Sequence, residues 1–152
     1  MAENAVESRT VIIGMDGSEF SQKAFDWYWE NLRRESDKVI LVYVPEYHTV
    51  VLSPLEISAF STLTNLYAEE EQMTKDYIEK LTSLLKDKHA KGKVKATTGR
   101  PGEVIVKTAE DMNADVIITG SRGMGTIRRT ILGSVSDYVM HHSSVPVIVC
   151  KH

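Results

Sequence analysis

The sequence has few of the features that mark a specialised class of protein. Its 152 residues include one cysteine, Cys150, which excludes an internal disulfide and fits a reducing compartment. No apolar run approaches the roughly 18 residues that a membrane-spanning helix needs. The opening stretch, MAENAVESR, is polar and acidic and lacks the apolar core of a secretory signal. We therefore expect a cytoplasmic protein with no membrane contact.

Basic charge is also scarce. The chain has 18 Lys and Arg residues against 21 Asp and Glu residues, for a formal net charge of −3, and no block of basic residues. A nucleic-acid-binding surface is therefore not expected, although a local basic pocket would fit. The hydrophobic and charged fractions, 42% and 26%, are ordinary for a globular chain. The length favours one domain, expected over residues 10–152 after a disordered polar tail at residues 1–9.

Two common nucleotide-binding signatures are missing. The chain has no Gly-x4-Gly-Lys-Ser/Thr, so it has no P-loop. The turn after the first apolar run reads GMDGSE, which is not the Gly-x-Gly-x-x-Gly of dinucleotide-binding folds. Any phosphate site must therefore use another pattern.

Five short apolar runs predict strands. They are continuous rather than alternating in polarity, which is typical of parallel strands buried on both faces. The weakest run, at 93–99, does alternate, as an edge strand would. The runs span residues 10–16, 38–46, 93–99, 114–120 and 145–150.

Helical segments lie between these runs. Ser18 is expected to cap a helix through about Glu35, which would bury Ala24, Trp27, Tyr28 and Leu32. The longest helix is expected from about Leu63 to Ala90. Its apolar stripe comprises Leu66, Met73, Tyr77, Leu81, Leu84 and Leu85.

Two further helices complete the pattern. Pro101 occupies a first-turn position, and a last helix is expected from Ser134, where SVSD has the form of a capping box. The alternation of strands and helices predicts an α/β fold, a doubly wound five-stranded parallel sheet with right-handed crossovers and helices on both faces.

The segment GSRGMGTIRRTILGSVSD, residues 120–137, combines four glycines with three arginines directly after a predicted buried strand. Glycines let a phosphate approach the peptide plane, and a helix start offers further N–H groups. In an open parallel sheet, ligands bind beyond the carboxyl ends of the strands at the switch point. If the first and fourth strands are neighbours, this segment and GMDGSE border one crevice. The residues alone therefore predict a phosphate-bearing ligand there.

At these residues the chain resembles the universal stress protein family, in its ATP-binding branch. The family signature Gly-x2-Gly-x9-Gly-Ser/Thr is matched by Gly120, Gly123, Gly133 and Ser134. The resemblance covers essentially the whole chain, including IIGMDGSEFSQKAFDW and RPGEVIVKTAEDMNADVIITGSRGMG. It implies the strand order 3-2-1-4-5, with the switch point between strands one and four.

The resemblance also implies a set of ATP-binding residues. Asp16 would lie beside the adenosine, and the backbone of Val44 would meet the adenine edge. Thr119 and Gly120 would line the ribose side, and the later glycines and the helix start would hold the phosphates. The full set is Gly14, Met15, Asp16, Val44, Thr119, Gly120, Arg122, Gly123, Gly125, Gly133, Ser134, Val135 and Ser136.

Several of these residues have plainer explanations. Asp16 could serve only to cap the first helix, and Ser134 is expected to cap the last helix whatever else it contacts. Arg122 is the best arginine candidate for a phosphate partner; Arg128 and Arg129 fit ordinary surface charges. The irregular stretch at residues 47–62 could be a lid, a partner-binding loop or a solvated connection.

No metal site is expected. His141 and His142 are adjacent on a predicted helix, so their side chains point about 100° apart and do not chelate one ion. Cys150 is expected to be a small buried hydrophobic residue.

Three functions remain open on the sequence. The first is a regulatory stress-response module occupied by ATP, AMP or ADP. The second is a slow ATPase, at most, with Mg²⁺ bridging the phosphates; Asp16 is the only obvious carboxylate in the crevice, and nothing supports Glu19 or Asp137 as a base. The third is an interaction protein with an empty or vestigial pocket. Similar proteins commonly form homodimers through the last strand, and pairing would cover that apolar edge.

Overall fold

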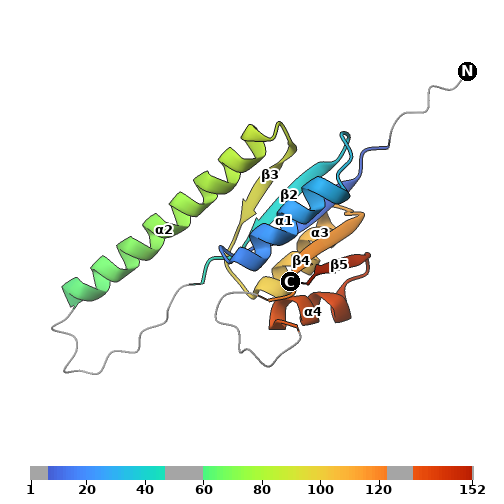
Figure 1. The fold of residues 1–152 in the computed structure, drawn as a ribbon. Coiled ribbons are helices and arrows are strands. Elements are labelled where there is room, and N and C mark those ends of the chain that lie inside the picture. The colour runs from blue at the N-terminus through green and yellow to red at the C-terminus, as the bar shows by residue number, and fades with distance from the viewer. Residues whose placement is uncertain (1–6, 47–59, 123–131, 152) are drawn as a thin grey trace, which may run out of the picture.

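A computed structural model describes residues 7–46, 60–122 and 132–151, without the side chains of residues 60–65. Five parallel strands form one sheet in the order β3-β2-β1-β4-β5 (Figure 1), which confirms the predicted fold class and strand order. The elements are β1 Thr10–Met15, α1 Glu19–Asn31, β2 Lys38–Tyr43, α2 Phe60–Asp87, β3 Lys91–Ala96, α3 Pro101–Asp111, β4 Val116–Gly120, α4 Ser134–His142 and β5 Val147–Cys150.

Helices cover both faces of the sheet. On one face, α1 and α2 pack on β-strand residues such as Ile13, Leu41 and Ile118. On the other face, α3 and α4 pack on the alternate residues, such as Ile12 and Ile117. Because side chains alternate along each strand, the central strands contribute to both cores. This is the reason that their sequences are continuous apolar runs.

Helix α1 places one tryptophan differently from the prediction. Ala24 and Tyr28 are fully buried, but Trp27 is 38% exposed, so its predicted core position was wrong. Trp29 instead packs on the core, stacks on Phe25 at 6.0 Å and carries the Arg33 guanidinium 4.0 Å above its ring. Both tryptophans flank the buried stripe of α1, and helical spacing alone does not decide which of them the core covers.

Only the second half of the predicted α2 stripe is buried. Leu81 and Leu85 belong to the core, and Tyr77 and Leu84 pack against it. Leu66 and Met73, by contrast, are 49% and 70% exposed. The helix is longer than the sheet it covers, and its amino-terminal half runs out beyond the strands (Figure 1). The prediction that Leu66 and Met73 face the core was therefore wrong.

The starts of α3 and α4 were predicted with unequal success. Pro101 opens α3 within its first turn, as expected. Helix α4 does begin at Ser134, but the residue in the N-cap position is Gly133, and no side chain makes a capping hydrogen bond. Ser134 is already the first residue of the helix, so its predicted role as the cap was wrong.

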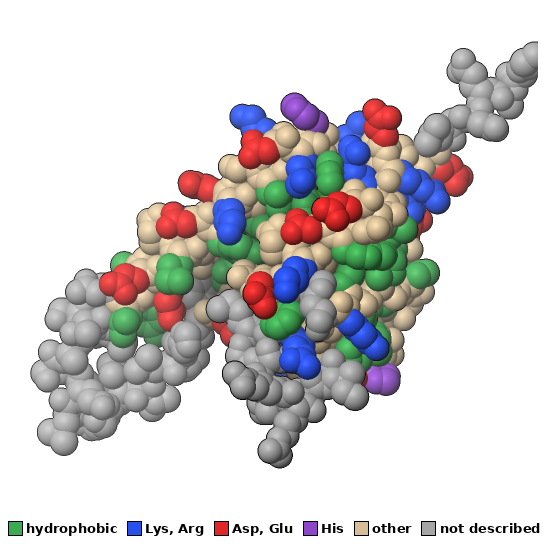
Figure 2. All heavy atoms as spheres, viewed as in Figure 1, with side chains coloured by type: hydrophobic (Ala, Val, Ile, Leu, Met, Phe, Trp, Pro, Cys, Tyr) green, Lys and Arg blue, Asp and Glu red, His purple; other side chains and the backbone are tan. Residues whose placement is uncertain are grey.

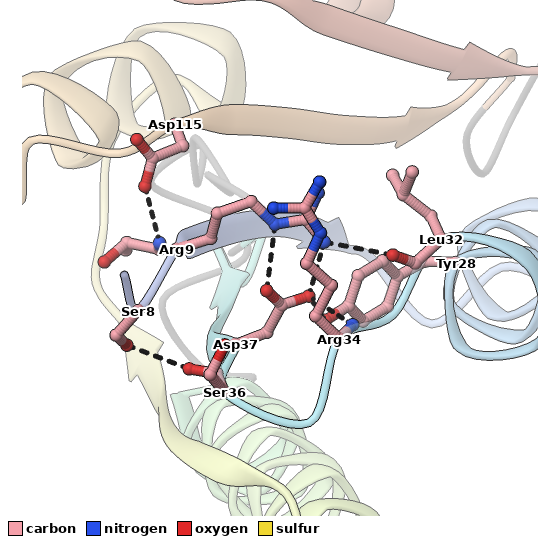
Figure 3. Close-up of polar contacts among 9 residues, drawn as sticks. Ser8, Arg9, Tyr28, Leu32, Arg34, Ser36, Asp37 and Asp115 are labelled. Carbon is pink, nitrogen blue, oxygen red and sulfur yellow. Dashed lines mark hydrogen bonds and ion pairs between the residues drawn. The ribbon is translucent and has the colours of Figure 1, made fainter. Parts of the chain in front are cut away.

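A buried carboxylate that no sequence pattern indicated joins the strands at the edge opposite the glycine-rich segment. Asp37, 3% exposed, accepts hydrogen bonds from Arg9 Nε and Nη2 at 2.9 and 2.7 Å (Figure 3). It also accepts from the Tyr28 hydroxyl at 2.7 Å and from the backbone N–H of Arg34 at 2.9 Å. This cluster ties the residue before β1 to the residue before β2 and to α1.

The electrostatics of this cluster follow from its geometry. Burial alone would raise the pKa of the Asp37 carboxyl, but the hydrogen bonds from Arg9, Arg34 and Tyr28 outweigh burial and leave that pKa below its ordinary value. Burial and the hydrogen bond to Asp37 raise the pKa of the Tyr28 phenol. Asp37 is thus held as a carboxylate.

The surface carries both signs of charge. On the face that Figure 2 shows, Lys and Arg side chains lie intermixed with Asp and Glu side chains. Within the described ranges, none of the helices is both long enough and apolar enough to span a lipid bilayer.

Candidate functional site

The two predicted ligand-binding segments meet at the carboxyl edge of the sheet. β1 pairs directly with β4 (Ile13 beside Ile118), so the strand order reverses between them, as predicted. The link is close: a Cβ atom on Gly120 would lie 2.8 Å from the carbonyl oxygen of Phe20 in the first turn of α1. Gly120 is therefore required by helix–strand packing, a reason independent of any ligand.

The turn after β1 is organised by Asp16. Its carboxylate accepts hydrogen bonds from the Ser18 backbone N–H at 2.9 Å and from the Ser18 hydroxyl at 2.5 Å. Ser18 in turn caps α1 by accepting from the Ser21 N–H at 3.2 Å, as the sequence predicted. Gly17 between them has a φ of 83°, in the left-handed region that favours glycine. Asp16 therefore supports the helix cap while its side chain is exposed at the carboxyl edge of the sheet, where the ligand is predicted.

Tyr77 contacts this turn, although its sequence position predicted only a place in the apolar stripe of α2. Its hydroxyl accepts a hydrogen bond from the Gly17 N–H at 2.9 Å, and its ring meets Tyr43 edge-on at 4.7 Å. Burial raises the pKa of the Tyr77 phenol. The signal that could have revealed it is a tyrosine, rather than an aliphatic residue, in a buried stripe: such a hydroxyl usually finds a partner.

A hollow lies beside the turn, bordered by α1 and α2. It is shallow, with a volume of about 410 Å³, and is lined by residues of the turn and of both helices, among them Gly17, Gln22, Tyr77 and Lys80.

The two ends of the glycine-rich segment also meet. The Gly133 N–H donates to the Ser121 carbonyl at 2.5 Å, and the Ser136 hydroxyl contacts the same carbonyl at 3.3 Å. Ser121 is itself fixed, because its N–H donates to the Cys150 carbonyl of β5 at 2.9 Å. The start of α4 is therefore attached to the residue that follows β4.

The first turn of α4 presents backbone donors at this edge. The Asp137 N–H makes the first intrahelical bond, to the Gly133 carbonyl at 3.0 Å. The N–H groups of Ser134, Val135 and Ser136 precede it and have no acceptor within the helix. The positive end of the helix dipole lies at the same place. An anion would be held there by backbone groups.

The remaining described candidates lie around this edge. Val44 follows β2 and is buried in the core on the α3/α4 face. Gly14 and Met15 end β1; Met15 packs in the opposite core. Thr119 is buried near the end of β4. Arg122 is half-buried and lies two residues after that strand. The structure therefore brings Thr119, Gly120, Gly133 and Ser136 together around Ser121, and brings Asp16 to the same edge.

Other predictions fall on residues that the structure does not describe. These are Gly123, Gly125, Arg128, Arg129 and residues 47–59 of the irregular stretch predicted at 47–62. Residues 60–62 of that stretch belong to α2, so their prediction as irregular was wrong.

Two further predictions concern Cys150, expected to be buried, and the adjacent histidines His141 and His142, not expected to bind one metal ion. Cys150 lies buried in the core, as expected, and burial raises the pKa of its thiol. His141 faces Asp137 at 3.4 Å, and His142 stacks on Tyr138 at 4.0 Å, so the two rings have separate partners. In the described part of the chain, no group of three or more His, Cys, Asp or Glu side chains is placed to hold a metal ion.

Known proteins resemble this chain in sequence and in fold. A family model described as the universal stress protein family matches residues 7–151. Among known sequences, the universal stress protein A family protein C25B2.10 of Schizosaccharomyces pombe is 28% identical over 95% of this chain. The chain spans 45% of the length of that relative and 64% of the length of another curated relative.

Solved structures share the whole fold. The structure of protein MJ0577, a universal stress protein of Methanocaldococcus jannaschii, has a TM-score of 0.74 and 29% identity, and the match covers 95% of this chain and 96% of that one. A universal stress protein family protein from Arabidopsis thaliana, solved with AMP bound, has a TM-score of 0.68 and 19% identity over 95% of this chain and 92% of that one.

Proposed function

The chain belongs to the universal stress protein family, and from this premise we propose that it binds an adenine nucleotide, ATP first, as a nucleotide-dependent regulatory module of the stress response. The phosphates would lie between the loop after β4 and the start of α4. The adenosine would lie toward Asp16 and Val44. Binding, rather than turnover, is the activity proposed.

The observation that carries the proposal is the contact between Gly133 and Ser121. It joins two segments that the family signature spaces apart, so that the end of β4 and the α4 N-terminus border one place. Because the Gly133 N–H is used in this contact, the donors for phosphate would be the N–H groups of Ser134, Val135 and Ser136. Arg122, at the start of the loop, would add a positive charge.

The nucleoside end has less support from contacts. Asp16 is exposed at the same edge and is fixed by Ser18, so its carboxylate would meet a ligand without first having to be ordered. That the fold accommodates an adenine nucleotide is supported by the AMP-bound structure of the plant protein.

A slow ATPase is the second candidate. Mg²⁺ would then be held chiefly by the phosphates themselves, because the described carboxylates and histidines form no cluster for a metal ion. Hydrolysis also needs a base that aligns water. Asp16 is engaged with Ser18, and Asp137 faces His141, so neither is an obvious base.

Calorimetric titration with ATP, AMP and GTP tests the proposed function. We expect saturable binding of the adenine nucleotides, with GTP weaker. No heat of binding with any adenine nucleotide would instead favour an interaction protein with a vestigial pocket.

Single-turnover release of ADP from bound ATP separates binding from catalysis. With Mg²⁺ present, we expect a rate no higher than that of ATP in buffer. A faster rate that depends on Mg²⁺ would establish the ATPase.

A homodimer through β5 is a further part of the proposal. β5 is the edge strand next to β4, and its residues Val147, Ile148 and Val149 are only partly covered. Antiparallel pairing with a second copy would satisfy the unpaired backbone groups and cover these side chains. We expect sedimentation velocity to show a dimer that Val149→Pro, which removes a backbone donor, shifts toward monomer. A single monomeric species at high concentration would contradict this.

A further inference from the structure

Four lysines lie on one face of the sheet at its β3 edge. Three of them alternate along β3, and the fourth, Lys38 of β2, lies directly beside Lys91 in the register of the two strands. Alternate residues of a strand point to the same face, and residues in register on neighbouring strands share a face. The lysine row, as we call this set, comprises Lys38, Lys91, Lys93 and Lys95.

The lysine row lies on the α3/α4 face but beyond these helices. Ile40, the register partner of Lys93, belongs to the core on that face. Helix α3 lies against β1 and α4 against β5, whereas β3 is the outermost strand at the other edge of the sheet (Figure 1). Lys95 is half-buried, and the other three lysines are exposed. The row is therefore accessible from solvent.

The positive charge of the row is not compensated within the described part of the chain. There, no carboxylate lies within ion-pair distance of any of the four lysines, whereas Lys23 and Lys107 each pair with a carboxylate one helical turn away. Like charges directly opposite each other destabilise a sheet, and Lys38 and Lys91 are so placed. An anionic partner would relieve this repulsion.

The same edge carries open backbone groups. Among the described strands, β3 pairs with β2 alone. The Thr97 N–H donates to the Tyr43 carbonyl of β2 at 3.2 Å. Because backbone groups alternate in direction along a strand, the N–H and C=O groups of Val94 and Ala96 point away from β2. An extended chain laid along β3 could pair with them.

We propose that the β3 edge binds an extended acidic segment of another protein, which joins the sheet as an added strand. Residues two apart on a strand are separated by about 6.6 Å, so carboxylates at alternate positions of the added strand would match the spacing of the lysine row. A second copy of β3 would bring two rows of lysines together, so self-pairing at this edge is disfavoured. The open backbone groups favour a peptide over a nucleic acid, which would use the lysines alone. The proposal is independent of nucleotide binding.

The probe is a fluorescent peptide in which glutamate alternates with valine or threonine. Fluorescence anisotropy is expected to show saturable binding to the full chain that weakens as salt is added. The same peptide with glutamine in place of glutamate is expected to bind about ten-fold more weakly or less. A short oligothymidylate serves as the competing polyanion. If it bound more tightly than the acidic peptide, the assignment of the partner would be wrong.

Lys93→Glu reverses the charge at the centre of the row and is expected to weaken peptide binding by about ten-fold or more. Lys23→Glu is the matched control, because it makes the same charge change at an exposed position of α1, which packs on the opposite face of the sheet. Its affinity for the peptide is expected to stay within about two-fold of that of the wild type. An equal loss in both variants would reduce the effect to net charge and overturn the site.

Hydrogen exchange of single backbone amides tests strand addition itself. The Val94 and Ala96 amides are expected to exchange about ten-fold more slowly, or slower still, once the peptide saturates the protein, because their N–H groups gain acceptors. Ala96→Pro removes one of these donors without a change of charge, and a loss of about three- to ten-fold in peptide affinity is expected. Peptide binding with unchanged exchange at both amides would refute strand addition.

Discussion

Gly123→Val is expected to weaken ATP binding by about 100-fold or more. Gly123 is the second glycine of the family signature, and under the proposed function a valine there would put a side chain where the phosphates would approach the backbone. Hydrogen bonds to charged groups contribute about 1.5–3 kcal/mol each, so the loss of two accounts for about 3–6 kcal/mol. Calorimetric titration of both proteins with ATP measures the difference.

A graded variant separates sterics from misfolding. Gly123→Ala has a smaller side chain and is expected to lose less affinity than Gly123→Val. Both should retain the far-ultraviolet circular dichroism of the wild type. Unchanged ATP affinity in folded Gly123→Val would remove the phosphate-binding role from the glycine-rich segment.

Asp37→Ala is expected to lower the free energy of unfolding by about 3 kcal/mol. It removes the carboxylate that pairs with Arg9, and it leaves the buried Tyr28 hydroxyl and the Arg34 N–H without their acceptor. The estimate is at the low end for buried pairs because the Arg9 side chain is partly exposed. Urea unfolding followed by circular dichroism measures the change.

Asp111→Ala is the control for this change. Its ion pair with Lys107 is a surface contact at 3.6 Å, so the cost should be below about 1 kcal/mol. Equal destabilisation by the two variants would show that the Asp37 cluster has no special role in stability.

The pH dependence of the same cluster has a defined sign. The folded-state pKa of Asp37 is lower than its unfolded value of about 3.9. Its charge therefore contributes stability that is fully present above about pH 4 and is lost as the pH falls through the folded-state pKa. The difference in unfolding free energy between wild type and Asp37→Asn should be constant near neutral pH and shrink below about pH 4. A difference that grows on acidification would contradict the assignment.

Much of the fold could be predicted because local signals and tertiary requirements agree. The central strands are buried on both faces, which gives continuous apolar runs, and Ser18 and Pro101 mark helix starts by their own backbone preferences. Errors arose where tertiary context decided. The apolar stripe of α2 extends toward the amino terminus as far as Leu66, but the sheet does not reach that part of the helix. Ser134 has a capping residue's side chain but already lies inside the helix.

The Asp37 cluster was missed because its partners lie far apart in sequence. A usable signal did exist: Arg9 precedes β1 and Asp37 precedes β2, and in neighbouring parallel strands such residues lie side by side. For the candidate site, the signature spacing predicted that the regions of Gly120 and Gly133 approach each other, but not that Ser121 joins them.

Nucleotide extraction tests the central claim, that backbone donors from two segments hold one adenine nucleotide, most directly. Protein purified from cells, and a second sample incubated with ATP and then desalted, would be denatured and the supernatants analysed by chromatography. We predict an adenine nucleotide peak from the wild-type protein and none from Gly123→Val. Absence of any adenine nucleotide from the wild-type protein, even after incubation with ATP, would contradict the account.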